Sequence, residues 1–96
     1  MLEKVKLALR LTTNAYDTRI QQLIDAAKTD LQIAGVVLPD QLDAICEQAI
    51  TTYCMLYFLG LSDQEFDRLS KAYDMQKGQL RTATGYTNWE TENAVS

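Results

Sequence analysis

The sequence contains no histidine, so the residues best able to act as acids, bases, nucleophiles or metal ligands are its thirteen acids and two cysteines. Histidine is the commonest general base and metal ligand near neutral pH, so the usual centre of an acid–base or metal site is missing. The nucleophile elbow GxSxG, the phosphate-binding P-loop and the dinucleotide-binding GxGxxG are also absent from the sequence. We therefore expect no enzymatic activity, no catalytic residue, no cofactor and no bound metal.

The acids that lie closest together form three groups: Asp40 with Asp43, the stretch 63–67, and Glu90 with Glu92. The first two groups stand where helices are expected to begin, and carboxylates there cap free N–H groups and interact well with the helix dipole. The stretch 63–67 also lacks the glycine and the ligand spacing of a calcium loop. Capping therefore explains these acids better than metal binding or acid–base catalysis does.

The two cysteines, Cys46 and Cys54, are eight residues apart. On one helix they would be separated by a rise of ~12 Å, which exceeds the Cα spacing that a disulfide allows. The sequence contains no CxxC pair that would indicate a zinc site. We expect two small buried thiols.

A first long segment has apolar residues at helical spacing, which predicts a helix over about 15–34. Asn14 is the expected N-cap, Asp17 is an acid in the first turn, and Gly35 is a natural C-terminal stop. The residues of the expected core face are Ile20, Leu23, Ile24, Ala27 and Leu31.

The second segment follows Pro39, with Asp40 as its expected N-cap, and ends at Gly60. Its apolar stripe is Leu42, Ile45, Cys46, Ala49, Ile50, Tyr53, Cys54, Tyr57 and Phe58. Further apolar residues near its end make the helix apolar on most sides, and such a helix is enclosed by its neighbours. We therefore expect a central helix with Tyr53, Tyr57 and Phe58 in the core.

The third segment opens with Ser62 and Glu65 in the spacing of a capping box. Gly78 weakens its last turn, so that the helix should end between 77 and 82. A short amphipathic helix is expected over 2–9. Nothing in the sequence alternates with period two, and the linkers are short, which favours antiparallel helices. The predicted fold class is all-α: a small bundle of three main helices plus a short N-terminal helix, with a non-helical C-terminal tail.

The domain boundaries that we predict are a helical domain over 1–80 and a tail over 81–96. The tail is polar and rich in threonine, yet it carries Tyr86 and Trp89. Because these residue types are favoured interface anchors, docking on another subunit or protein is the preferred interpretation. Folding back on the tail's own domain and a disordered end are the alternatives.

The net charge of −4 is spread unevenly along the chain. Residues 1–35 hold five basic and four acidic side chains, for a net charge of +1, whereas residues 36–96 hold four and nine, for −5. An acidic surface repels phosphate, which disfavours DNA binding. We see no apolar run of the length that a bilayer requires and no secretion signal at the N-terminus. We therefore expect the chain to be made in the cytoplasm and to have no association with a membrane.

Two stretches, LIDAAKTDL over 23–31 and GQLRTATGYT over 78–87, together with the order of the helices, resemble the phage head–tail connector family. These are the HK97-type head-completion adaptors, often described as DNA-packaging proteins, and the resemblance covers about 2–87. It implies a structural connector subunit of a tailed bacteriophage, placed in the virion at the head–tail junction.

The resemblance also implies partners. The family forms a homo-oligomeric ring, dodecameric in the virion, beneath the portal protein. The ring extends the DNA channel, through which DNA passes without specific binding, and it receives a stopper or tail-completion protein. The C-terminal segment is implied to reach the portal or a neighbouring copy. That interface role falls on Gln79, Leu80, Arg81, Tyr86 and Trp89. The alternative function is a small helical DNA-binding or regulatory module.

Overall fold

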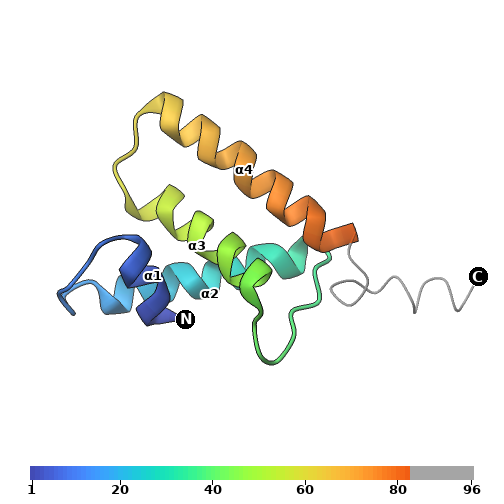
Figure 1. Cartoon of the computed structure of the whole chain (residues 1–96), viewed down its shortest axis with the longest axis horizontal. Helices are drawn as coiled ribbons and strands as arrows, with labels where there is room; N and C mark the ends of the chain where they lie inside the picture. The colour runs from blue at the N-terminus through green and yellow to red at the C-terminus, as the bar shows by residue number, and fades with distance from the viewer. Residues whose placement is uncertain (83–96) are drawn as a thin grey trace, which may run out of the picture.

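The computed structural model describes residues 1–82, and within this range the chain forms helices and no strand (Figure 1). The four helices are α1 (Leu2–Ala8), α2 (Asp17–Ile33), α3 (Ala44–Phe58) and α4 (Asp63–Thr82). The predicted all-α class and the order of the elements are confirmed. No helix of the described residues has the length and hydropathy needed to span a membrane.

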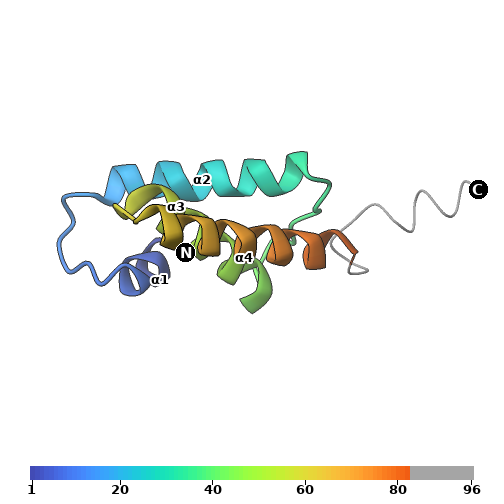
Figure 2. The same ribbon diagram turned by 90° about the horizontal axis from the view of Figure 1, so that it is seen from above.

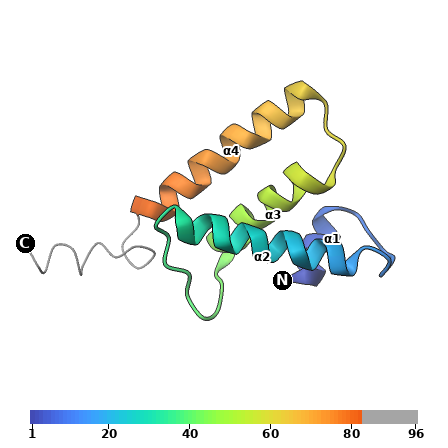
Figure 3. The ribbon, with the colours of Figure 1, turned by 180° about the vertical axis from the view of Figure 1, so that it is seen from behind.

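The central position of α3 organises the bundle. It packs against α2 on one side and against α4 on the other, and both views from the front and from behind show it between them (Figures 1 and 3). The short helix α1 packs across α2 and α3, and the view from above shows α2 along one edge of the molecule and α4 crossing in front of α3 (Figure 2). This arrangement places α3 at the centre of the bundle, as its sequence predicts, but Ile45 and Tyr57 of its expected apolar stripe are 49% and 52% exposed, so the helix is not enclosed along its whole length.

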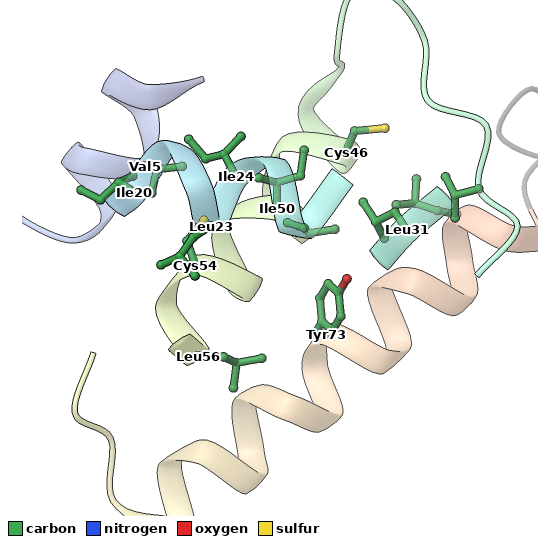
Figure 4. Close-up of a cluster of buried hydrophobic side chains, with 14 of the residues drawn as sticks. Val5, Ile20, Leu23, Ile24, Leu31, Cys46, Ile50, Cys54, Leu56 and Tyr73 are labelled. Atoms are coloured by element: carbon green, nitrogen blue, oxygen red, sulfur yellow. The ribbon is translucent and has the colours of Figure 1, made fainter. Parts of the chain in front are cut away.

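The hydrophobic core lies mainly between α2 and α3 (Figure 4). The five residues expected on the core face of α2, from Ile20 to Leu31, are all buried. The buried residues of α3 are Cys46, Ala49, Ile50, Thr52, Cys54 and Leu56. Val5 and Leu9 add the contribution of the N-terminal segment. Because each fully buried aliphatic side chain is worth about 1.5–3 kcal/mol, this pair of helices holds most of the stabilising surface of the fold.

The last helix contributes much less to the core. Of the twenty residues of α4, only Tyr73 and Leu80 are buried, with Leu69 partly buried against the core. Polar contacts assist at its second half, where the Tyr73 hydroxyl donates to Asp30 of α2 and the Lys77 ammonium lies 3.4 Å from the same carboxylate. The first half of α4 has no buried residue.

The start of α3 differs from the expectation. The N-cap is Asp43, whose side chain accepts a hydrogen bond of 3.0 Å from the Cys46 N–H, and the helix begins at Ala44. The prediction that Asp40 is the cap was wrong. Both acids have the required chemistry, but only Asp43 stands where the chain turns back along α2, and Asp40 remains exposed in the connection.

The start of α2 also differs, because Asn14 is used elsewhere. The residue before the helix is Tyr16, which makes no side-chain capping bond. Asn14 instead accepts a hydrogen bond of 2.6 Å from the buried ammonium of Lys6, which also lies 3.0 Å from Asp17. A buried charge needs such partners, and here they tie α1 to the first turn of α2.

The remaining helix ends agree with the sequence in most respects. Gly35 has the left-handed φ of 98° that suits a residue after a helix, as predicted. The central helix ends at Phe58, before Gly60. The Glu65 N–H donates to the Ser62 hydroxyl over 3.2 Å, which confirms the capping role of Ser62. The last helix continues to Thr82 and so includes the first two residues of the segment predicted to be non-helical.

Candidate functional site

The carboxylates that could have formed a reactive site are dispersed by the fold. Asp43 caps α3, while Asp63, Glu65 and Asp67 lie exposed on the first turns of α4. Within residues 1–82, no three side chains of His, Cys, Asp or Glu come close enough to hold a metal ion. Glu90 and Glu92 lie outside the described residues. Helix capping and dipole interaction account for the described groups.

The two thiols are free and buried, as the sequence predicts. Burial raises the pKa of the Cys54 thiol from 9.0 to about 11. Burial and the neighbouring Asp43 carboxylate raise the pKa of Cys46 from 9.0 to about 11. Since the thiolate is the nucleophile, both side chains are inert near neutral pH and serve as small apolar residues.

Three of the five predicted interface residues lie at the end of α4. Gln79 and Arg81 are exposed there, whereas Leu80 is buried in the chain's own core. Leu80 therefore supports α4 and offers no free surface, contrary to its expected place on an interface. Tyr86 and Trp89 lie outside the described residues. The docking role assigned to this segment stays a prediction.

Aromatic rings follow one another from α3 to α4. Tyr53 contacts Tyr57, with ring centroids 4.6 Å apart, and Tyr73, with centroids 5.6 Å apart. Tyr57 also meets Phe66 edge to face at 6.2 Å. The prediction that Tyr57 is a core residue was wrong, because its side chain is 52% exposed. On the side of Tyr57, the last turn of α3 faces the first half of α4, in which no residue is buried. This part of α4 therefore covers Tyr57 incompletely.

Tyr57 and Phe66 form what we call the aromatic patch, where α3 ends and α4 begins. Phe66 is 40% exposed. Tyr16 is another exposed aromatic residue near the end of α3, since its ring contacts Phe58 at 5.6 Å. The sequence marked Tyr57 and Phe58 as apolar helix positions, but it could not show which of them would lack a covering helix. Exposed aromatic residues are favoured anchors of protein interfaces.

A second apolar surface follows the end of α2. Ile33, the last residue of α2, is 81% exposed, and Val37 in the following connection is 41% exposed. We call these two residues the aliphatic patch. The connection passes beside the C-terminal end of α4 in all three ribbon views (Figures 1, 2 and 3). The Lys77–Asp30 ion pair lies in the same region, where it joins the second half of α4 to the last turns of α2.

The arrangement as a whole suits association with other polypeptides. Two apolar patches are exposed on a small helical body in which the Asp43 carboxylate caps α3 and both thiols are buried. Single exposed apolar residues are common on soluble proteins, but adjacent ones often mark interaction sites.

Comparison with known proteins agrees with this description. A family model described as phage connector protein matches residues 1–87, which is nearly the whole chain. No curated protein and no solved structure matches the chain significantly. The match includes both stretches on which the sequence resemblance rests. The chain therefore belongs to the phage connector protein family.

Proposed function

We propose that this chain is a non-enzymatic structural subunit that joins the head of a tailed bacteriophage to its tail. The observation that carries the proposal is the family match over residues 1–87. The inert thiols and the helix-capping carboxylates are consistent with a role in assembly and not in catalysis. The site of action in this proposal is the head–tail junction of the virion.

In the proposed assembly, copies of the chain form a ring of twelve beneath the portal protein. The ring extends the channel for DNA and presents its other side to a stopper or tail-completion protein. A ring supports this role physically, because a domain of 96 residues buries a modest fraction of its surface alone and gains stability when partners cover its apolar side chains. DNA passes through the ring without specific binding, as suits the net charge of −4.

The C-terminal segment is the proposed contact with the portal or with a neighbouring copy. Gln79 and Arg81 would begin this contact from the exposed last turns of α4. Tyr86 and Trp89 would supply its aromatic anchors, since large aromatic side chains dominate many interfaces.

The test is to disable the gene for this chain in its phage and to examine the lysate by electron microscopy. We expect heads and tails that accumulate unjoined, and infectivity restored by the intact chain supplied from a plasmid. A plasmid carrying Leu80→Asp, which places a charge in the core, should fail to restore infectivity. Normal numbers of joined, infectious particles without the chain would contradict the proposal.

A further inference from the structure

We draw no further inference here: the strongest candidate, the surface patch that Tyr57 and Phe66 form where α3 passes into α4, is exposed and apolar, but nothing in the structure shows what covers it.

Discussion

Helices α2 and α4 flank the same central helix, but they are held to it in different ways. Five of the seventeen residues of α2 are buried against α3 and α1, whereas only two of the twenty residues of α4 are buried. In place of apolar surface, α4 uses a polar contact with Asp30 at its second half and leaves its first half exposed. The comparison indicates that α2 and α3 hold most of the hydrophobic core, whereas α4 leaves most of its surface uncovered by the rest of the chain.

The largest effect should come from a cavity in the pair α2–α3. Ile24 is fully buried there, so Ile24→Ala should lower the free energy of unfolding by about 3 kcal/mol. The control is Phe66→Ala on α4, where the side chain is 40% exposed and the loss should stay below about 1 kcal/mol. Urea denaturation followed by circular dichroism measures both. Equal losses would mean that α4 is held as firmly as α2.

Alkaline pH should weaken α3 through its buried thiols. Because burial raises the folded pKa of Cys54 from 9.0 to about 11, the folded state keeps a proton that the unfolded state releases in this range. The stability from this group is fully present below pH 9 and is lost as the pH rises to about 11. The shift corresponds to about 3 kcal/mol.

The variant Cys54→Ala isolates this contribution from other groups that ionise at high pH. The difference in unfolding free energy between the intact chain and the variant should shrink as the pH rises from below 9 to about 11. A difference that stays constant over this range would show that the Cys54 thiol ionises as easily in the fold as in the unfolded chain.

The polar contact between α2 and α4 should have a smaller effect. Asp30→Asn removes the charge that accepts from Tyr73 and attracts Lys77, and it should cost about 1 kcal/mol because the site is partly exposed. The amides of α4 should exchange faster while those of α2 change little. The control is Asp25→Asn, since the exposed Asp25 side chain accepts from Gln21 of its own helix and the loss of stability should be within about 0.5 kcal/mol. Indistinguishable losses would show that the Asp30 contact does not hold α4.

The smallest effect that we predict is the difference in stability loss between substitutions of Asp43 and Asp40, the two acids that precede α3. Asp43→Ala should destabilise the chain by about 1 kcal/mol, because the Cys46 N–H loses its acceptor. Asp40→Ala should change stability by less than about 0.5 kcal/mol. Thermal unfolding of both variants provides the comparison. A greater loss of stability for Asp40→Ala than for Asp43→Ala would indicate that Asp40 is the N-cap, as the sequence alone predicts.

These two acids illustrate how far the sequence predicts the fold. Apolar spacing predicts the core face of α2 and the central position of α3, since both follow from the period of a helix. The choice between Asp40 and Asp43 depends on where α3 turns back along α2, which is a tertiary property. Lys6 is a similar case. Its burial follows from Asn14 and Asp17 being brought beside it, and nothing in the local sequence reports that.

The candidate surfaces were harder to predict than the core. Tyr57 lies on the apolar stripe of α3, so the sequence placed it inside, yet its exposure depends on how little of α4 covers the end of α3. Leu80 was expected to dock on a partner and is instead part of the core. Helical period identifies an apolar face, but it does not say whether the same chain or another one covers that face.

Hydrogen exchange read by mass spectrometry tests the central claim most directly. In the isolated chain, amides in the first half of α4 should exchange faster than those of α2 and α3, because no residue of that half is buried. On assembly with further copies or with the portal, the same amides and those around Val37 should become protected. If α4 is already as protected as α3 in the isolated chain, and assembly leaves its exchange unchanged, α4 is a structural helix and its exposed surface has no role in association.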